Sequence, residues 1–421
     1  MPQTPDRDAV RFLVASTHCE VAGLQDLIAA GRLVVGVRGL VHCLQRERGA
    51  SNLFLGSAGR CYGEQLGAYQ ADAAQAETRL REELAGWLSP PQVPRDCSRL
   101  FARIAMLLQG LTELPHLRAQ VHAGAGGVDA TMSSFNELIR GLLGVVFEAA
   151  DSAADPQISR ALVAMFNFMQ GKELAGQERA IGAAGFSRGE FDERLQQSLL
   201  HRIDGQERCF QTFTEFCDSE SLALWQHTLT AAHSTAVERL RRIACTQTKP
   251  RSPGIELAEI WFTQTTSRID AMKEVEDGLE AYLLGLCQSR IATVTAEQAS
   301  AEDRIAELAR SELAHDTPFA VVLGQSEAPP DADVQAPRRS VMDLVQRQSR
   351  RLQAMEDELQ AARQALNERK VIERAKALLM KHRDLSEDQA HRLLRQTAMN
   401  QNRRLVEVAE ATVAMADVLG S

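Results

Sequence analysis

The chain has 421 residues, of which 56 are acidic and 47 are basic, and its formal net charge is −9. Aromatic residues make up only 5% of it, and alternating apolar and polar residues are nearly absent, so we predict an all-α fold. No basic segment followed by an apolar one opens the chain, and no run of about 20 apolar residues occurs. We therefore expect no signal peptide and no contact with a membrane.

Eight cysteines are scattered along the chain without a CxxC pair. This favours reduced core residues over a metal centre or a disulfide framework, so we expect a cytoplasmic protein without a bound metal. P-loop and dinucleotide-binding strings, HExxH and a readable Ser-His-Asp arrangement are also missing from the sequence. We expect neither an enzyme nor a cofactor.

Apolar residues at helical spacing predict long helices joined by short loops. The predicted helices are Phe12–Ala30, Leu33–Ser57, Tyr69–Leu88, Leu100–Leu114, Val128–Asp151, Ile158–Phe186, Glu190–Asp218, Ser221–Ala244 and Pro253–Arg290. Turn signals separate them, such as the Pro-rich stretch after Leu88 and the Gly-rich stretch before Val128. Mostly antiparallel segments of this kind are typical of helix bundles.

An arginine stands at a core position of the second predicted helix. The apolar stripe of that helix, when it is continued by three and four residues beyond Leu44, reaches Arg48. A buried guanidinium needs a counter-charge, because an unpaired charge in the interior is very costly. Two interpretations are therefore open: an internal salt bridge, with Glu47 or an acid elsewhere, or a binding site for a small anion.

Later helices repeat this feature. Lys172, Glu173 and Arg179 stand where apolar residues are expected, and Arg268 lies in the middle of the apolar stripe of the last long helix. The string Gln177-Glu178-Arg179 also echoes Gln45-Arg46-Glu47-Arg48, which hints at an internal duplication. By contrast, a group of three arginines falls mainly outside the buried face of its helix and is expected to be solvated: Arg239, Arg241 and Arg242.

The C-terminal part differs in charge from the rest. Between Arg338 and Arg404 there are 16 basic and 9 acidic residues, and a basic segment in an acidic protein points to a polyanionic partner. Prolines and acids predict an extended linker at 315–339. A heptad seam predicts a coiled-coil helix from Val341 to Leu366, and three short amphipathic helices follow it.

These three helices resemble the ANTAR domain, an RNA-binding antitermination module. The match runs from Arg369 to about Ala416 without gaps in type or spacing, and it includes Ala375, Lys376, Leu379, Met380, Lys381, Ser386, Ala390, Leu393, Leu394, Arg395, Ala398, Met399, Arg404, Leu405 and Ala409. The resemblance implies a coiled coil plus a three-helix bundle over 340–421. It also implies binding to paired short hairpins in leader RNA, which keeps a terminator from forming.

Five basic residues of this segment are our candidates for RNA contacts: Lys376, Lys381, Arg395, Arg403 and Arg404. For each of them, a solvated helix face is the alternative interpretation.

Three earlier strings resemble the NIT domain, a nitrate- and nitrite-sensing module. They are LQRERGASNLFLGS, MQGKELAGQERAIGAAGF and WFTQTTSRIDAMKEVE, in this order. The resemblance implies two packed four-helix bundles over 1–314, with arginines that sense the anion. It carries over to Arg48 and Arg179 and favours the anion site for Arg48, while Arg268 is added from its stripe position alone.

The order of the two domains resembles nitrate-responsive transcription antiterminators of bacterial nitrate assimilation. The implied partners are nitrate or nitrite as the effector and a leader RNA with paired hairpins, bound by a homodimer at least in the active state. The basic segment beside an acidic sensor suggests that the empty sensor holds the RNA-binding domain. The alternative is a sensor that relays a signal through its coiled coil to a protein, without RNA binding. DNA binding is a third possibility, because the C-terminal helices could mimic a helix-turn-helix.

Overall fold

The computed structural model describes residues 7–60, 62–87, 98–125, 127–151, 155–246, 255–312, 360, 367–368, 370–383, 385, 387–401 and 403–419. Every regular element within these ranges is an α-helix, which confirms the predicted all-α fold. The predicted linker at 315–339 and the predicted coiled-coil seam from Val341 to Leu366 fall almost entirely outside the described residues.

The first half of the chain forms a four-helix bundle. Helix α1 (Arg7–Gly56) packs against α2 (Gly63–Trp87) and α5 (Gly127–Asp151). The fourth member is broken into α3 (Ser98–Leu111), which packs on α5, and the short α4 (Leu114–His122). The bundle therefore has one long central helix and one broken member.

The second half repeats this arrangement. Helix α6 (Pro156–Arg188) packs against α7 (Glu193–Phe216) and α10 (Ile255–Glu312). Again the fourth member is broken, into α8 (Ser219–Thr230) and α9 (Ala232–Thr246), which both pack on α10. The two halves thus have the same order of elements.

The two breaks correct the sequence-based expectation. Leu100–Leu114 was expected to stand alone, but α4 follows it, with Pro115 in the first turn of the new helix. A single helix was expected over Ser221–Ala244, but Ala231 takes an extended conformation with φ −67° and ψ 152°, and α8 ends there. Pro115 marks the first break, because proline favours the first turn of a helix. The second break carries no comparable signal, because apolar residues continue on both sides of Ala231.

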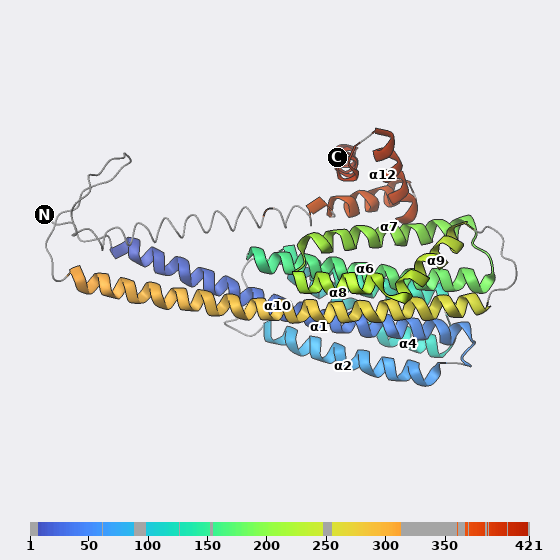
Figure 1. Cartoon of the computed structure of the whole chain (residues 1–421), viewed down its shortest axis with the longest axis horizontal. Helices are drawn as coiled ribbons and strands as arrows, with labels where there is room; N and C mark the ends of the chain where they lie inside the picture. Colours follow the sequence, from blue (N-terminus) through green and yellow to red (C-terminus); the bar gives the residue numbers. More distant parts are fainter. Residues whose placement is uncertain are drawn as a thin grey trace.

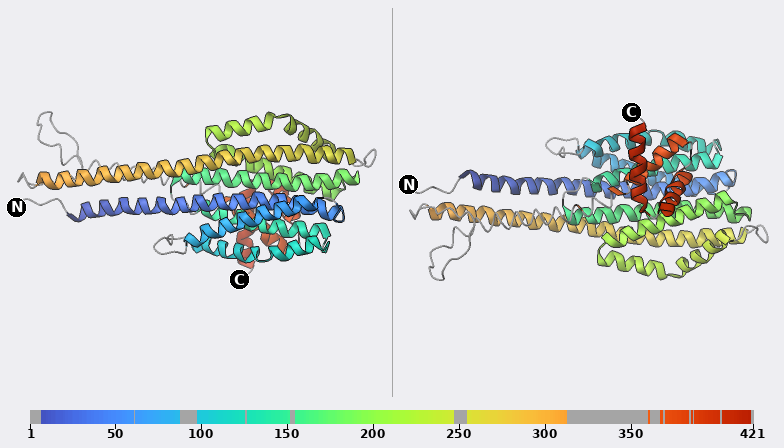
Figure 2. Two further views of the ribbon diagram at one scale, coloured as in Figure 1. Left: turned by 90° about the horizontal axis from the view of Figure 1, so that it is seen from below. Right: turned by 90° about the horizontal axis from the view of Figure 1, so that it is seen from above.

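The two bundles pack side by side (Figures 1 and 2). Helix α1 contacts α10 and α6, and α5 contacts α6, so two central helices of each half form the interface. A single core runs through both halves, from Leu33 on α1 to Phe168 on α6 and Leu279 on α10. This confirms the prediction of two packed four-helix bundles.

Helix α1 is longer than predicted. The expected break near Gly31 is absent, and one helix runs from Arg7 to Gly56. A Cβ added at Gly31 would lie 3.6 Å from Sγ of Cys287 on α10, so this glycine is a contact point between helices. Beyond the bundles, α1 and α10 continue together as a two-helix arm (Figure 2).

A smaller bundle follows at the C-terminus. It contains the helical residues 370–383, α12 (Glu387–Gln401) and α13 (Leu405–Leu419). Its core is small and built from Ala375, Leu394, Ala398, Val408 and Ala409. The predicted three-helix bundle is therefore confirmed, and Figure 1 shows it lying over α7.

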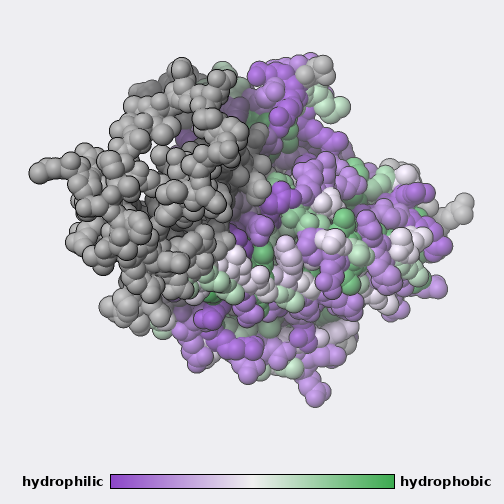
Figure 3. All heavy atoms as spheres, turned by 60° about the vertical axis from the view of Figure 1, so that its left-hand side comes forward, coloured by the Kyte–Doolittle hydropathy of each residue, from purple (hydrophilic) through white to green (hydrophobic). Residues whose placement is uncertain are grey.

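One stretch of α1, from Ile28 to Gly56, is long and apolar enough to cross a membrane by length and composition. It carries buried charges, however, and 56% of its most apolar window is buried inside the protein. This is the pattern of a core helix. On the face shown in Figure 3, the described surface is mostly hydrophilic, with small apolar patches.

Gly182 provides a test of the packing between α6 and α10. An added Cβ would lie 2.2 Å from Cε2 of Trp261, whose ring is fully buried. We expect Gly182→Ala to lower the free energy of unfolding by about 1–3 kcal/mol through overpacking. Gly144→Ala is the matched control, because nothing lies within 4 Å of its added Cβ and helix propensity favours Ala there. Urea unfolding measures both, and equal stability of the two variants would contradict the packing.

Candidate anion site and nucleic-acid interface

A cavity of about 470 Å³ opens between the two bundles, where α1, α2, α6 and α10 meet. Cationic side chains gather on its wall: Arg46 and Arg48 come from α1, and Lys172 and Arg179 come from α6. Of the described residues that line it, only Asp270 is acidic. Three of these cations have ion-pair partners next to the cavity: Arg46 pairs with Asp72, Arg48 with Glu173 and Lys172 with Glu276. Among the described residues of this wall, Arg179 is therefore the cation that a small anion could pair with directly.

Arg48 is 2% exposed and already holds a carboxylate. Its Nη1 donates to Oε1 of Glu173 at 2.5 Å and to Oδ1 of Asn136 at 2.5 Å. Its Nη2 donates to Oε2 of Glu173 at 3.1 Å. The internal salt bridge that the sequence left open is thus present, and its acid is Glu173 on α6 instead of the neighbouring Glu47.

Arg179 reaches the cavity from the other bundle. Its Nη1 donates to Oγ1 of Thr266 at 2.9 Å, and its Cζ lies 5.0 Å from the centroid of the Phe262 ring. No carboxylate of the described residues lies within ion-pair distance of it. Burial, and then the nearby Arg48, lower the pKa of Arg179 to about 10, so it remains charged at neutral pH. Asp270 and Glu173 act on its charge from a longer distance, so an incoming anion would meet a guanidinium without a directly bonded carboxylate.

Each of the two arginines lies against a glycine of the opposite helix. A Cβ added at Gly176 on α6 would lie 3.0 Å from Nη2 of Arg48, and one added at Gly49 on α1 would lie 3.4 Å from Nη2 of Arg179. The small residues let the central helices approach, so that both guanidinium groups fit between them. This close approach could not be read from either motif alone.

The two halves also place their neighbouring acids alike. Glu47 accepts from Nε and Nη2 of Arg118 on α4, at 2.7 and 2.8 Å. Glu178 accepts from Nε and Nη2 of Arg241 on α9, both at 2.6 Å. In each Glu-Arg string, therefore, the acid pairs inside its own bundle and the next residue points to the cavity. This supports the internal duplication that the sequence suggested.

Comparisons with known proteins place the chain in a family. The profile for nitrate and nitrite sensing (NIT) matches residues 39–284, and the ANTAR domain profile matches residues 360–413. The chain belongs to the NIT family. It is 36% identical to the nitrate regulatory protein of Klebsiella oxytoca over 410 residues, or 97% of this chain and 95% of that protein. The solved structure of the NasR transcription antiterminator has 33% sequence identity and a TM-score of 0.62, and the match covers 98% of this chain and 100% of that one.

Both resemblances that the sequence motifs indicated are thereby confirmed. The two large bundles are the NIT domain, and the small C-terminal bundle is the ANTAR domain. Arg48 and Arg179, which were predicted for the anion site, lie at one cavity within the NIT domain. Sequence reasoning did not identify Gln45 and Thr266, which also line it, because single polar residues on a helix carry no signal of their own.

Arg268, the third arginine predicted for the anion site, does not line this cavity. It lies inside the second bundle of the NIT domain, near Arg241 and Glu178, and is 6% exposed. Burial, and then Arg241, lower its pKa to about 10. Its stripe position correctly indicated a buried cation. A stripe shows that a side chain points inward, but it does not show which buried space the side chain reaches.

The expectation that Arg241 is solvated is wrong. It is 7% exposed and forms the buried ion pair with Glu178, whereas Arg239 and Arg242 are exposed as expected. The break at Ala231 restarts the helix and shifts its phase, so a stripe counted through the break misplaces the later residues. Burial alone would raise the pKa of Glu178, but the charge and hydrogen bonds of Arg241 outweigh it and lower that pKa.

Two further titratable groups lie on the cavity wall. Lys172 is 1% exposed, and its Nζ donates to Oε2 of Glu276 at 2.5 Å; burial nevertheless lowers its pKa. Burial, and then Lys172, lower the pKa of His42 to about 3. His42 is therefore neutral at physiological pH and adds no positive charge to the cavity.

The five residues predicted for RNA contacts do not share one environment in the ANTAR domain. Lys381, Arg403 and Arg404 are exposed; Arg403 donates to Glu407, and Arg404 donates to Glu368. Lys376 is only 6% exposed and bonds to Glu373, so it is not available to RNA in this arrangement. The fifth candidate, Arg395, is exposed but engaged with the NIT domain.

Helix α12 of the ANTAR domain lies against α7 of the NIT domain. Arg395 donates to Asp204 of α7, and the ring of His391 lies 4.8 Å from the ring of His201, between centroids. Lys370 adds an ion pair of 3.6 Å with Asp151. Burial, and then Arg208, lower the pKa of His391 to about 3. The contact is therefore small and partly ionic, as in an interface that can open.

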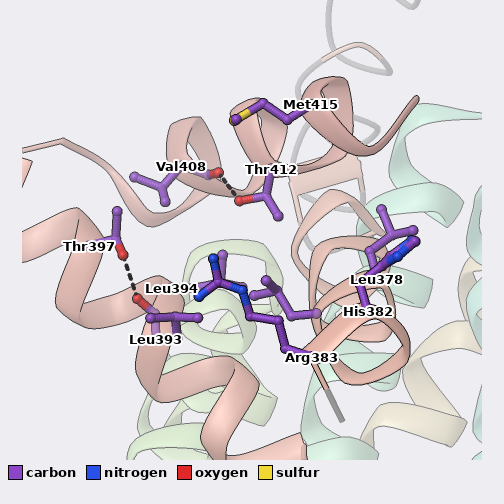
Figure 4. Close-up of a pocket in the computed structure, with 10 residues that line it drawn as sticks. Leu378, His382, Arg383, Leu393, Leu394, Thr397, Val408, Thr412 and Met415 are labelled. Atoms are coloured by element: carbon purple, nitrogen blue, oxygen red, sulfur yellow. Dashed lines mark hydrogen bonds between the residues drawn. The ribbon is translucent and has the colours of Figure 1, made fainter. Parts of the chain in front are cut away.

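A separate groove of about 350 Å³ lies among the three helices of the ANTAR domain (Figure 4). Its wall is mainly apolar, with Leu378, Leu394, Val408 and Met415 among the lining residues and Arg383 at its side. None of the five candidates for RNA contacts lines it. The groove therefore belongs to the packing of this small bundle and does not gather its positive charge.

The buried pair of Glu178 and Arg241 should be a main support of the second bundle. We expect Arg241→Met to lower the free energy of unfolding by about 3 kcal/mol, because it leaves a buried carboxylate unpaired. Arg81→Met breaks an exposed pair with Glu77 and should cost less than about 1 kcal/mol.

Urea unfolding at neutral pH measures both variants. Since the folded pKa of Glu178 lies below its ordinary value, the stabilisation is present at neutral pH and is lost as the pH falls through that folded pKa. Equal costs for the two variants would contradict this role.

Proposed function

We propose that this protein is a nitrate- and nitrite-responsive transcription antiterminator. In this proposal, an anion binds between the two bundles of the NIT domain and frees the ANTAR domain, which then binds paired hairpins in a leader RNA and keeps a terminator from forming. One observation carries the proposal: two arginines, one from each bundle, reach the same cavity in a chain that also contains an ANTAR domain.

The chemistry of the cavity suits the effector. Nitrate and nitrite are planar and carry one delocalised charge, and a guanidinium fork can donate two parallel hydrogen bonds to such a group. Arg48 and Arg179 come from α1 and α6, so an anion between them would bridge the two bundles. Because the site is largely shielded from water, the attraction is stronger than it would be at the surface.

Helix α10 connects the cavity with the C-terminal part of the chain. Phe262, Thr266 and Asp270 of this helix line the cavity, and the helix continues to Glu312, just before the predicted linker. An anion that shifts α10 relative to α1 would therefore act where the linker begins. Binding would then bias two arrangements of the bundles, as a ligand does when it prefers one of two states.

We also propose that the empty NIT domain holds the ANTAR domain. Arg395, a candidate for RNA contacts, is paired with Asp204 of the sensor, so the acid takes the place of a phosphate. Release would separate Arg395, which is already exposed, from Asp204 and leave it free to contact RNA together with Lys381, Arg403 and Arg404. Lys376 would become accessible to RNA only if its bond to Glu373 broke and its side chain turned out of the ANTAR bundle.

RNA binding would follow general rules for basic modules. Phosphate contacts make the affinity fall with salt, and unpaired loop bases supply the specificity. No Phe, Tyr or Trp follows Phe319, so the ANTAR domain would read those bases without stacking them on such rings. In the cytoplasm, a homodimer would present one ANTAR domain to each of the paired hairpins.

The direct test measures binding to a leader RNA with two tandem hairpins, with and without millimolar nitrate. We expect nitrate to raise the RNA affinity at least about tenfold, a typical coupling between two sites. Arg48→Ala and Arg179→Ala should lose this response, whereas the exposed Arg60→Ala should keep it. Calorimetry with nitrate alone shows whether the anion itself binds. RNA binding that ignores nitrate would contradict the gating, and no RNA binding in any condition would favour relay to a protein partner.

Two charge-reversal variants test whether the contact of the NIT domain with Arg395 restrains the ANTAR domain. We expect Asp204→Lys to raise the RNA affinity measured without nitrate, because it replaces the partner of Arg395 with a like charge. Glu207→Lys is the matched control: it makes the same change of charge on the same helix at an exposed position. An equal rise in both variants would indicate a general electrostatic effect, and no rise for Asp204→Lys would contradict the proposed hold.

A further inference from the structure

The carboxylate of Glu173 is surrounded by donors from both bundles. Besides the two bonds from Arg48, it accepts from Nε2 of Gln45 at 2.9 Å and from Nε2 of Gln177 at 2.7 Å. The side chain is 3% exposed. Four N–H groups thus converge on one planar anion, which comes from α6 of the protein itself.

This arrangement has the chemistry of the proposed effector site. A carboxylate presents two oxygens and one delocalised negative charge in a plane, as nitrite does, and nitrate adds a third oxygen. The fork of Arg48 holds Glu173 through two nitrogens, in the way a guanidinium holds such an anion. Arg48 and Gln45 also line the cavity, so an anion in the cavity and Glu173 would approach the same donors.

The charges make the two anions mutually exclusive partners. With Glu173 in place, the charge of Arg48 is neutralised at 2.5 Å, and an incoming anion would meet a carboxylate of the same sign nearby. In a shielded site, such a like charge is repulsive over several ångströms. Arg179, by contrast, lacks a carboxylate within ion-pair distance among the described residues. An incoming anion would therefore bind Arg179 first.

We propose that Glu173 is a tethered competitor of the effector. Its carboxylate occupies the fork of Arg48 in the empty sensor, and the anion, held first by Arg179, displaces it and takes over Arg48 and Gln45. This inference rests on the proposed function and adds the residue that sets the anion affinity. Gln177, one turn further along α6, remains beside the displaced carboxylate.

Displacement would also change the link between the bundles. Arg48 and Gln45 lie on α1 and Glu173 lies on α6, so their bonds join the two central helices directly. An anion shared by Arg48 and Arg179 replaces this link with another between the same helices but at a different place on α6. The exchange of partners is therefore a physical difference between the empty and the occupied sensor.

Glu173→Gln tests the competition, because it keeps the shape of the side chain and removes its charge. The measurement is nitrate titration by calorimetry on the full chain, with thermal unfolding as the check of folding. We expect Glu173→Gln to bind nitrate about tenfold more tightly than the wild type, the size of one lost charge-assisted bond. The nitrate concentration that half-saturates RNA binding should fall by the same factor. Weaker or unchanged binding would overturn the inference and make Glu173 a residue that only positions Arg48.

Two controls separate competition by Glu173 from a general change in the electrostatic potential of the cavity. Asp270→Asn removes an exposed acid from the same cavity, and an equal gain in both variants would overturn the inference. In the Arg48→Ala background, Glu173→Gln should bring no gain, because the shared donor is missing; a persisting gain would also overturn it.

If Glu173→Gln does not fold, Glu173→Asp is the second variant. It keeps the charge but withdraws the carboxylate by one methylene, so a smaller gain than tenfold is expected and no gain would overturn the inference. If neither the wild type nor any variant binds nitrate, the proposed function itself fails, and this inference fails with it.

Discussion

A guanidinium buried between helices needs a counter-charge, and the NIT domain is arranged around this requirement. Arg48 meets it with Glu173 across the interface of the two bundles. Arg179, which lines the same cavity from α6, has a hydroxyl and an aromatic ring instead of a carboxylate. The same interface thus contains one cation with an ion-pair partner and one without, and the proposed response to a small anion rests on this asymmetry.

The duplicated architecture explains why the site lies where it does. In each half, a buried acid ties the central helix to the broken member of its own bundle, through Glu47 and Arg118 or through Glu178 and Arg241. The following arginine is then directed to the other half. The same Glu-Arg arrangement in both halves therefore produces a shared cavity that neither bundle could form alone. Glycines on the opposite helices leave room for the two guanidinium groups.

Sequence alone predicted the parts of this structure that depend on periodicity and motif. The all-α fold follows from long apolar stripes. The paired bundles and the two arginines of the cavity follow from the resemblance to the NIT domain that strings such as LQRERGAS and AGQERAIG carry. The placement of Arg241 and Arg268 did not follow, because a helix break shifts the phase and because a stripe does not distinguish two interiors. The ion-pair partner of Arg48 could not be predicted from the sequence either, since the choice between Glu47 and Glu173 depends on how α6 packs against α1.

The continuous helix α10 has a mechanical consequence. It runs without interruption from Ile255 to Glu312, and at 1.5 Å per residue its far end lies roughly 70 Å beyond Thr266 on the cavity wall. A rigid rod of this length acts as a lever: a tilt of about 5° at the cavity would move the far end by roughly 6 Å. An exchange of hydrogen bonds smaller than one side chain could therefore become a displacement as large as a helical turn where the chain leaves the sensor.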